Sequence, residues 1–458
     1  MHWGWIVFLI LLYFLIPACL YLLVPESPTQ EDLNRRQHAV VLVLGDLGRS
    51  PRMLYHALSL AKGDVRVTLC GYEGSKPLQE IQDHELITIQ HIPVIENDNR
   101  LPFVLYAIQK VLKQHLILLK LLKKTNRPDF LVIQNPPSIP VLGVVRFFNL
   151  FISRRTRVVI DWHNFGYTIL GLKLGSKHPL VFIAKYYERI FGRRAWIHLC
   201  VSVTMGRVLR TSFGLSGRRI IPLHDRPASA FKPLTEAERK LICKTHPLFN
   251  EFDASKDKCI ISSTSYTPDE NYQTLLDALK LYDQSSKKGL PNILCIVTGK
   301  GPLKDEFEQK VKECSFQRVM IKTAWLSMEE YPKIMACADL GISLHESSSG
   351  LDLPMKILDM FGCGVPVVAV DFLALFELVK THKNGIIVTG APEMATALTS
   401  LFSSQGKLDN LKRGAMRESR QGWDANWLEK VGPLFGVGEY RKAGSEEKEL
   451  SSDDSDYE

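Results

Sequence analysis

The sequence predicts an α/β protein with two Rossmann-like lobes, each built on a parallel β-sheet, preceded by one membrane-spanning helix. Three observations support this prediction. Short β-branched runs alternate with helical stretches in two blocks, an irregular segment separates the blocks, and a long uncharged run stands near the N-terminus. Strands that alternate with helices form parallel sheets, because each crossover helix returns the chain to the same end of the sheet.

The uncharged run extends from Trp3 to Val24 and predicts the membrane-spanning helix. As a helix it would measure roughly 33 Å, against a hydrocarbon core of about 30 Å. A cleaved signal peptide is the alternative, but its apolar region would be shorter and would follow basic residues. Arg35 and Arg36 lie on the C-terminal side of the run, so the positive-inside rule predicts that the body of the protein faces the cytosol.

The two α/β blocks set the predicted domain boundaries. Five β-branched runs predict an N-terminal lobe over residues 37–225; they occupy residues 38–44, 65–71, 86–92, 129–135 and 157–163. The periodicity is lost over residues 226–257, which we expect to be a linker. Six further runs predict a C-terminal lobe over residues 258–435; they occupy residues 259–265, 292–299, 319–324, 338–345, 365–371 and 384–390. Residues 1–24 are the predicted anchor, and residues 436–458 form an acidic tail that we expect to be disordered.

Charge and cysteine usage narrow the class of protein. The formal net charge is +8, and the last fourteen residues contribute seven acids and one lysine, so the rest of the chain carries +14. Such a body favours anionic partners: nucleic acid, phosphorylated substrates or an anionic membrane face. The nine cysteines form no CxxC pair, which argues against a disulfide framework or a zinc site and indicates reduced thiols in the cytosol.

The first run ends in a turn that contains Gly45, Asp46, Gly48 and Arg49. Open parallel sheets bind ligands beyond the carboxyl ends of their strands. The two glycines let the backbone approach a ligand closely, and the helix that follows offers N–H groups to an anion. The spacing is neither GxGxxG nor that of a Walker loop, so a tight turn without a ligand is an equal alternative. Arg49 is a candidate phosphate contact, with a surface ion pair as the alternative.

The segment 338–371 carries a stronger phosphate signal. Ser348, Ser349 and Gly350 form a small-residue loop before a helix and offer backbone donors to a diphosphate. Lys356, on that helix, adds a cation. A small-residue turn with a purely structural role is the alternative.

Two further features extend this candidate site. Asp359 lies seven positions beyond Asp352, about two helical turns, so it can share that face and accept hydrogen bonds from ribose hydroxyls. "VTGKGPLKDEF" (297–307) supplies a second glycine turn with Lys300 at a strand end. Two such turns at one sheet edge favour a nucleotide site over two unrelated structural turns.

Several motifs in this segment and elsewhere resemble those of a known family. "LPMKILDMFGCGVPVVA" and "GKGP" are similar to the nucleotide-sugar site of GT-B glycosyltransferases. "VVLVLGDLGRSPRMLYHALSLA", "IQNPPSIP", "VVIDWHNFGYTILGL", "KYYERIFGRRA", "ISSTSYTPDEN" and "SLHESSSGLDLPMKILDMFGCGVPV" are similar, in this order, to the chitobiosyldiphosphodolichol β-mannosyltransferase family. The resemblance covers residues 38 to about 430.

The resemblance implies a reaction and its partners. The family transfers mannose from GDP-mannose to dolichyl-diphosphate-linked di-N-acetylglucosamine, in a β-1,4 linkage that inverts the donor's anomeric configuration. It acts on the cytosolic side of the endoplasmic reticulum membrane, which agrees with the predicted single-pass anchor. Other mannosyltransferases of the same pathway are further candidate partners, and nucleic acid is not expected to be one.

Inversion in one step needs a base for the acceptor hydroxyl and donors for the leaving diphosphate. In inverting GT-B enzymes the first-strand loop faces the acceptor, so Asp46 is the first candidate base. His163, at the end of "VVIDWH", is the second. The alternatives are a turn or cap role for Asp46 and a sugar-positioning role for His163.

The sequence departs from GT-B relatives that have two glutamates eight residues apart, because Leu351 stands at the first of these positions and Asp359 at the second. Asp352 or Glu346 could substitute as the donor-sugar contact. In many GT-B relatives an Arg and a Lys follow the first strand of the C-terminal lobe, but here Asp269 and Glu270 stand at these positions. Lys300 and Lys356 are therefore the expected cationic contacts of the diphosphate.

No DxD metal motif occurs in either lobe, so we expect no metal ligands there and leave the divalent metal dependence open. Asp454 and Asp456 fit the pattern, but they lie in the acidic tail. Two basic apolar stretches, 101–127 and 146–157, could lie in a membrane interface, with ordinary sheet-covering helices as the alternative. A retaining mannosyltransferase of the same pathway and a non-catalytic scaffold are the alternative functions.

Overall fold

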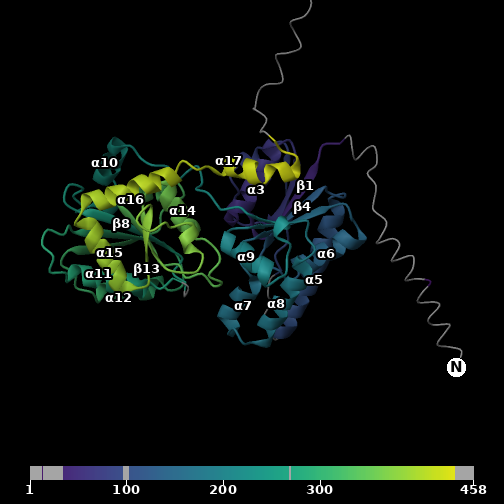
Figure 1. Cartoon of the computed structure of the whole chain (residues 1–458), viewed down its shortest axis with the longest axis horizontal. Coiled ribbons are helices and arrows are strands. Elements are labelled where there is room, and N and C mark those ends of the chain that lie inside the picture. Colours follow the sequence, from purple (N-terminus) through teal and green to yellow (C-terminus); the bar gives the residue numbers. More distant parts are fainter. Residues whose placement is uncertain (1–12, 14–34, 96–102, 268–269, 439–458) are drawn as a thin grey trace, which may run out of the picture. The chain divides into compact units, whose positions relative to one another are not determined.

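The computed structural model describes Tyr13 and residues 35–95, 103–267 and 270–438 (Figure 1). The predicted anchor, apart from Tyr13, and the acidic tail lie outside these ranges. No helix within them combines the length and the apolar composition that a bilayer crossing requires. The contacts between residues divide the chain into two units: residues 1–161, 182–198 and 428–458 form the first, and residues 162–181 and 199–427 form the second.

A seven-stranded sheet has the strand order β3-β2-β1-β4-β5-β6-β7. Its strands are β1 (His38–Asp46), β2 (Arg66–Tyr72), β3 (Ile87–Ile92), β4 (Phe130–Asn135), β5 (Arg157–Trp162), β6 (Ile197–Cys200) and β7 (Ile220–Pro222). β1 pairs in parallel with β2, His38 facing Arg66, and with β4, Ala39 facing Phe130. The five predicted strands are all present, whereas β6 and β7 were missed because each is only three or four residues long.

The helices between these strands follow the expected alternation. They are α3 (Pro51–Lys62), α4 (Gln79–Gln82), α5 (Phe103–Lys124), α6 (Val141–Phe151), α7 (Gly166–Leu174), α8 (Pro179–Gly192) and α9 (Val203–Thr211). α3 starts directly after the glycine turn with Pro51 at its first position, where the missing N–H leaves no helical bond unmade. Nine of the twelve residues of α3 are buried, and the helix contacts β1 and β2.

A six-stranded parallel sheet lies in the second unit, in the order β10-β9-β8-β11-β12-β13. Its strands are β8 (Lys258–Thr264), β9 (Ile293–Gly299), β10 (Val319–Ala324), β11 (Leu340–Ser343), β12 (Val367–Val370) and β13 (Gly385–Val388). β8 pairs in parallel with β11, so the loops that follow these two strands lie side by side. All six predicted strands are confirmed, as is the prediction of two parallel-sheet lobes.

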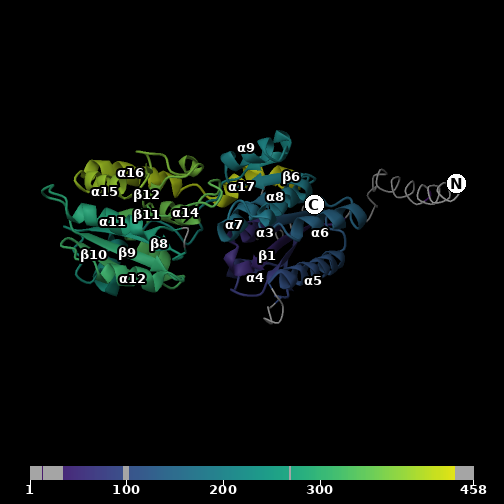
Figure 2. The ribbon, with the colours of Figure 1, turned by 90° about the horizontal axis from the view of Figure 1, so that it is seen from below.

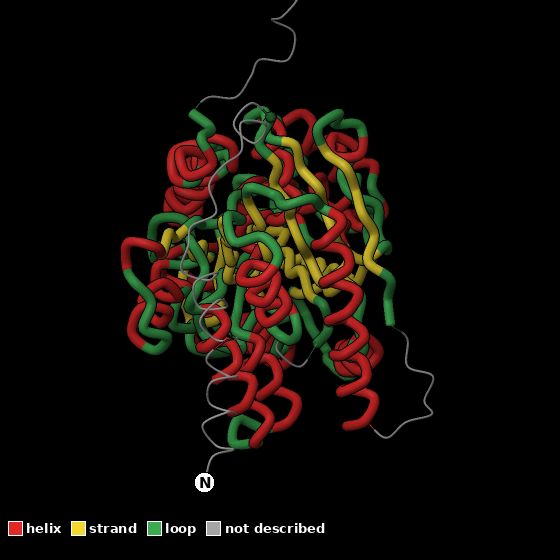
Figure 3. The backbone as a smooth tube through the Cα atoms, turned by 90° about the vertical axis from the view of Figure 1, so that its right-hand side faces the viewer, coloured by secondary structure: helices red, strands yellow, loops and turns green. Residues whose placement is uncertain are grey.

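Helices cover both faces of this second sheet. They are α11 (Tyr272–Asp283), α12 (Lys304–Lys312), α13 (Glu330–Ala336), α14 (Met355–Gly362), α15 (Ala391–Phe402) and α16 (Gln405–Glu418). α11, α12 and α15 contribute to one buried cluster, and α13 and α14 contribute to another. Figure 2 shows α11, α12 and α15 beside the strands, and Figure 3 shows the strands in yellow among the red helices. Two buried clusters fill the space between sheet and helices, one with Leu275 and Leu279 of α11, the other with Ile357 and Phe361 of α14.

The segment 226–257 is not wholly irregular. It contains α10 (Glu236–Thr245), which begins with a capping box: Thr235 Oγ1 accepts from the Glu238 N–H, and the Glu238 carboxylate accepts from the Thr235 N–H. No residue of this helix is fully buried, and only Ile242 and Cys243 pack partly against the core, so its apolar signal in the sequence is weak. The chain ends with α17 (Trp423–Lys430), after which Phe435 packs on Phe130 of β4 with a ring-centroid distance of 4.7 Å.

Candidate active site

Loops at the carboxyl ends of β8, β9 and β11 form the candidate donor site of the second unit. In a parallel sheet these ends share one edge, and their loops can converge on one ligand. The loop after β8 leads through Glu270 to α11, the loop after β9 contains Lys300, and the loop after β11 runs from His345 to α14. An isolated bridge between Glu270 and His345 joins the first and the third of these loops.

Lys356 and Glu270 form an ion pair that links α14 to the loop after β8. The Glu270 side chain is buried, and its carboxylate also accepts from Thr264 Oγ1 (2.6 Å) and the Ser265 N–H (2.5 Å). Lys356 Nζ donates in addition to Ser265 Oγ (3.2 Å). Lys356, the predicted diphosphate contact, therefore pairs with Glu270. In the sequence, Glu270 stands out only as a difference from GT-B enzymes.

The glycines of the second turn bring the loops after β8 and β9 into backbone contact. A Cβ atom on Gly299, where φ is +150°, would lie 1.8 Å from the Thr264 carbonyl oxygen, and one on Gly301 would lie 1.7 Å from that of Ser265. No side chain fits at either position. Lys300 stands between them with its side chain exposed at the same edge of the sheet.

The loop after β11 is organised around the carboxylate of Asp352. His345 Nε2 lies 3.3 Å from it, Ser347 Oγ donates to it, and Asn164 Nδ2 donates to it at 3.2 Å. Burial raises the pKa of Asp352, but the bonds from His345 and Ser347 outweigh burial and hold the pKa below its usual value. Asn164 also donates to Ser348 Oγ (3.2 Å), so the residue that follows His163 in the sequence contacts the small-residue loop.

Backbone donors of the small-residue loop already have partners within the loop. The Gly350 N–H donates to Ser347 Oγ at 2.8 Å, and the Leu351 N–H donates to Ser349 Oγ at 3.2 Å. Gly350 has φ of +71°, in the left-handed region that favours glycine. An incoming diphosphate would have to replace these hydroxyl acceptors to use the two N–H groups.

Asp359 differs from the other carboxylates of the site. Burial raises its pKa to about 7, and the nearby Lys356 charge offsets only part of that rise. The structure gives its carboxylate no hydrogen bond within the described residues, although its charge reaches Tyr331 and Cys363. A desolvated carboxylate that still has its acceptor capacity fits the predicted role toward ribose hydroxyls, which are strong donors.

Asp46, the first candidate base, lies in the first unit at the end of β1. Its carboxylate accepts from the Gly48 N–H (3.0 Å), the Ser75 N–H (3.0 Å) and Ser75 Oγ (2.9 Å), and Arg49 Nε lies 3.5 Å away. Slight burial raises the pKa of Asp46, but these hydrogen bonds and the Arg49 charge lower it below its usual value. A Cβ on Gly48 would lie 2.4 Å from the Ser75 carbonyl oxygen. A glycine is therefore needed at this position for the turn to approach Ser75 closely.

The other residues of the first turn have simpler environments. Arg49 is 82% exposed beside Asp46, which is the surface ion pair named as the alternative to a phosphate contact. Gly45 has no close neighbour that would exclude a side chain. His163 is half-buried directly after β5, and it has an interaction within the described part of the chain.

Two groups of polar residues were missed from the sequence. In the first unit, the buried Asp161 carboxylate accepts from Arg52 Nε (2.7 Å) and Nη2 (2.9 Å) and lies 3.1 Å from His56 Nε2, which ties α3 to β5 two residues before His163. In the second unit, Glu377 accepts from the Val203 and Thr204 N–H groups at the start of α9, both at 2.7 Å. The first group could have been recognised in the sequence, because its polar residues interrupt apolar strand and helix patterns. Glu377 stands in no such pattern, so nothing in the sequence indicated its role.

Two family models match the chain. The model described as glycosyl transferases group 1 matches residues 248–418, and the model described as glycosyltransferase family 4 matches residues 48–224. The chain is 56% identical over 459 residues to the chitobiosyldiphosphodolichol beta-mannosyltransferase of Yarrowia lipolytica, covering 99% of both chains. The proteins of that name from Candida albicans (45%, covering 94% and 95%) and Homo sapiens (38%, covering 87% and 92%) are also similar.

The chain belongs to the chitobiosyldiphosphodolichol beta-mannosyltransferase family. It is a glycosyltransferase with two Rossmann-like lobes of the GT-B fold. Solved structures support the fold: Anabaena HepE in complex with UDP has a TM-score of 0.61 at 15% identity, and sucrose-phosphate synthase from Thermosynechococcus elongatus has 0.65 at 14%. These two comparisons cover 88% of this chain and 100% and 98% of the respective structures.

The raised pKa of Asp359 gives the enzyme a pH-dependent stability that the sequence did not indicate. In the unfolded chain this carboxyl titrates near its usual 3.8, and in the fold near 7, so the folded state binds more protons between these values. Stability therefore falls as pH rises from about 4 to about 7. We expect Asp359→Asn, which carries no charge, to raise the melting temperature at pH 8 by roughly 5 °C or more and to change it little at pH 4.

Differential scanning fluorimetry across this pH range would measure the effect. Asp371→Asn is the matched control, because that side chain is exposed beside the same sheet and its loss should shift the melting temperature equally at both pH values. An Asp359→Asn shift without pH dependence would contradict the assigned desolvation.

Proposed function

We propose that the enzyme transfers mannose from GDP-mannose to di-N-acetylglucosamine that is linked through diphosphate to dolichol, forming a β-1,4 bond. The observation that carries this proposal is the 56% identity over 99% of both chains with a protein of the corresponding name. GDP-mannose as donor follows from the family resemblance and is supported by a candidate nucleotide site at the carboxyl edge of the second sheet.

The proposed acceptor is a membrane lipid, and an enzyme that acts on it would benefit from a membrane anchor such as the N-terminal run of 22 uncharged residues. We propose that Trp3–Val24 anchors the enzyme by a single span in the endoplasmic reticulum membrane, with the catalytic lobes on the cytosolic side. The position of Arg35 and Arg36 supports this orientation. A fixed anchor confines the enzyme to the surface where the lipid acceptor lies.

In the proposed donor complex, Asp359 accepts from ribose hydroxyls and Lys356 contributes charge to the diphosphate. Lys356 donates to Glu270 and Ser265, and an ammonium group has three donors, so one N–H is left for a phosphate oxygen. Lys300, exposed on the neighbouring loop, and the Ser348–Gly350 loop are further proposed contacts. Asp352, already fixed by His345 and Asn164, is the proposed sugar contact.

For the base, the hydrogen bonds of Asp46 argue against it and leave His163 as the candidate. A general base has to take the proton of the acceptor hydroxyl at the working pH. The carboxylate of Asp46 accepts three hydrogen bonds and has a lowered pKa, so it is a weak base that is occupied in holding its turn. His163 follows a strand end and precedes Asn164, which contacts the donor loop. We therefore propose His163 as the base and Asp46 as the residue that shapes the acceptor-side turn.

The proposed reaction can be tested with purified full-length enzyme, GDP-mannose and a chitobiosyl-diphosphate lipid. We expect one mannose to be added per acceptor, and digestion with a β-mannosidase but not an α-mannosidase should remove it. A product with an α linkage would show a retaining enzyme of the same pathway, and no product from any lipid-linked acceptor would favour a non-catalytic role.

The ion pair between Lys356 and Glu270 allows the binding and structural roles of the lysine to be separated. Lys356→Ala should weaken GDP-mannose binding by roughly 1.5–3 kcal/mol, because one charge-assisted contact to the diphosphate is lost. The same change should also destabilise the fold, because Glu270 becomes a buried charge without its partner.

In the double variant Lys356→Ala/Glu270→Gln, the buried charge is removed as well. We expect this variant to recover most of the lost melting temperature while donor affinity, measured by isothermal titration calorimetry, stays weak. Recovery of both quantities together would contradict a direct role for Lys356 in binding.

The two candidate bases predict opposite kinetic outcomes. His163→Ala should lower kcat by about 10² to 10⁴-fold and abolish the acidic limb of the pH–rate profile, with little change in donor affinity. Asp46→Asn should keep kcat within about tenfold. A steep loss of kcat in Asp46→Asn, at unchanged melting temperature and with His163→Ala near wild type, would return the base to Asp46.

A further inference from the structure

The helix α5 has an apolar stripe that faces away from the body of the first unit. Leu105, Ile108, Leu112 and Leu116 are spaced by three and four residues, which places them on one side of the helix, and each is more than half exposed. The opposite side already supplies the core, because Leu118 and Leu122 are fully buried. A helix that covers a sheet needs only one apolar face. The exposed apolar stripe of α5 is a second such face, and it indicates contact with something outside this lobe.

Two neighbouring helices continue this surface. α6 contacts α5, and Tyr187 of α8 is bonded through its hydroxyl to the backbone of Gly143 and Pro140 at the start of α6. Figures 1 and 2 both show α5, α6 and α8 together on the first unit. α6 and α8 present six large exposed side chains: Phe147, Phe151, Phe182, Ile183, Tyr186 and Ile190. Exposed apolar side chains in this number on three neighbouring helices mark an interaction site.

The charges around this surface have one sign. Between residues 101 and 198 the chain has sixteen lysines and arginines but three acids: Asp129, Asp161 and Glu188. The side chains of Asp161 and Glu188 are fully buried, and Asp129 is mostly buried and paired with Arg35. No exposed acid therefore stands among the described residues of this stretch, while the exposed Lys113, Lys120 and Lys123 of α5 accompany its apolar stripe.

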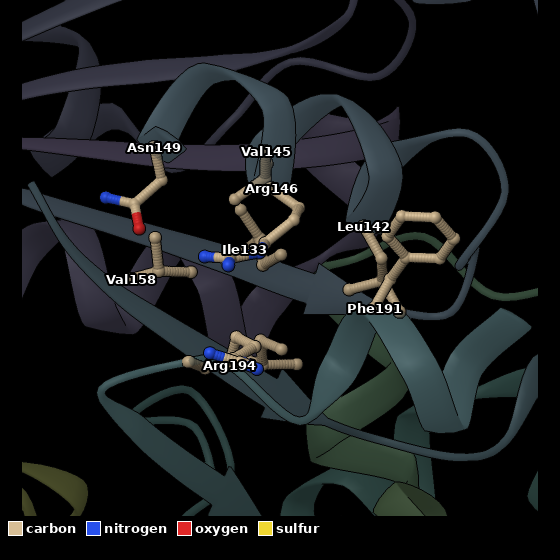
Figure 4. A pocket seen from close by; sticks show the side chains of 10 residues that line it. Ile133, Leu142, Val145, Arg146, Asn149, Val158, Phe191 and Arg194 are labelled. Carbon is tan, nitrogen blue, oxygen red and sulfur yellow. The ribbon is translucent and has the colours of Figure 1, made fainter. Parts of the chain in front are cut away.

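A small pocket between α6 and α8 adds to the positive charge. Figure 4 shows Arg146 of α6 and Arg194, just after α8, around a floor formed by Ile133 and Val158. Burial lowers the pKa of Arg146, and the Arg194 charge lowers it further, as expected for two like charges brought together. The described residues place no carboxylate within ion-pair distance of either guanidinium. An external phosphate would offset this repulsion.

We propose that the outer face of α5, α6 and α8 rests on an anionic bilayer surface, with its aliphatic and aromatic side chains in the interface and its basic side chains against lipid phosphates. This combination of exposed apolar residues and cations without acids is what an interfacial helix presents to a membrane. A protein partner would be expected to meet acids as well as bases at its rim. The contact extends the proposed function, because it would hold the first lobe at the surface where a lipid-linked acceptor lies.

The test uses full-length enzyme in lipid nanodiscs of phosphatidylcholine alone or of phosphatidylcholine mixed with phosphatidylinositol. Hydroxyl-radical footprinting with mass spectrometry would report the oxidation rates of Phe147, Phe151 and Tyr186. We expect these rates to fall at least about threefold in the anionic discs. Raising the salt from about 0.1 M to about 1 M shortens the Debye length from about 10 Å to about 3 Å and should reverse most of the protection. Trp325 and Met328, exposed on the second unit, serve as internal references.

Charge-reversal variants distinguish this face from general attraction of a basic protein. Lys113→Glu/Lys120→Glu should abolish the protection, whereas Lys288→Glu/Lys312→Glu, which makes the same change in net charge on exposed positions of the second unit, should leave it intact. Equal oxidation in neutral and anionic discs would overturn the proposal. So would protection that appears in lipid-free detergent and grows with protein concentration, since a second copy would then cover the face. The readout does not involve mannose transfer, so it can fail or succeed independently of the proposed reaction.

Discussion

A buried acid determines how the candidate donor site is built. Glu270 lies at the start of α11, where the chain leaves the loop after β8, and its carboxylate binds that loop through Thr264 and Ser265. Because a buried carboxylate requires a counter-charge, Lys356 of α14 is drawn to it, and the segment between β11 and α14 is fixed at its far end. Asp352 fixes the same segment at its middle through His345 and Asn164. Without the Glu270 charge, Lys356 would keep only its hydrogen bond to Ser265 Oγ.

The fold was largely predictable, because its signals are short-range and repeated. Both sheets consist of β-branched runs separated by helices, and the physical requirement that crossover helices join parallel strands leaves little freedom. The structure adds β6, β7 and α10, none of which has enough residues or enough buried apolar surface to be recognised in isolation. Their positions depend on neighbours that are distant in sequence.

The candidate site was predictable only in its location. Spacing identified the loops that carry Lys356 and Asp359, because position within a βα unit determines which residues reach the sheet edge. Spacing could not show that Glu270 pairs with Lys356 or that Ser75 supplies two of the hydrogen bonds to Asp46, since these partners lie 86 and 29 residues away. The balance between burial and hydrogen bonding that sets the pKa of each acid is likewise a property of three-dimensional contacts. Asp352 and Asp359 lie seven residues apart, yet the pKa of the first is lowered and that of the second is raised.

The backbone contacts at Gly299 and Gly301 have a thermodynamic consequence for the proposed nucleotide site. The carbonyl oxygens of Thr264 and Ser265 occupy the positions where side chains at Gly299 and Gly301 would stand. These two backbone segments therefore pack against each other and lose their conformational entropy when the protein folds. A nucleotide that then binds need not order them, so more of its contact energy is expressed as affinity. The small-residue loop after β11 is different, because its N–H groups must exchange internal partners for the ligand. At the proposed nucleotide site, selectivity among nucleotides would therefore arise in the rigid half, and the adaptable half would respond to the sugar and the diphosphate.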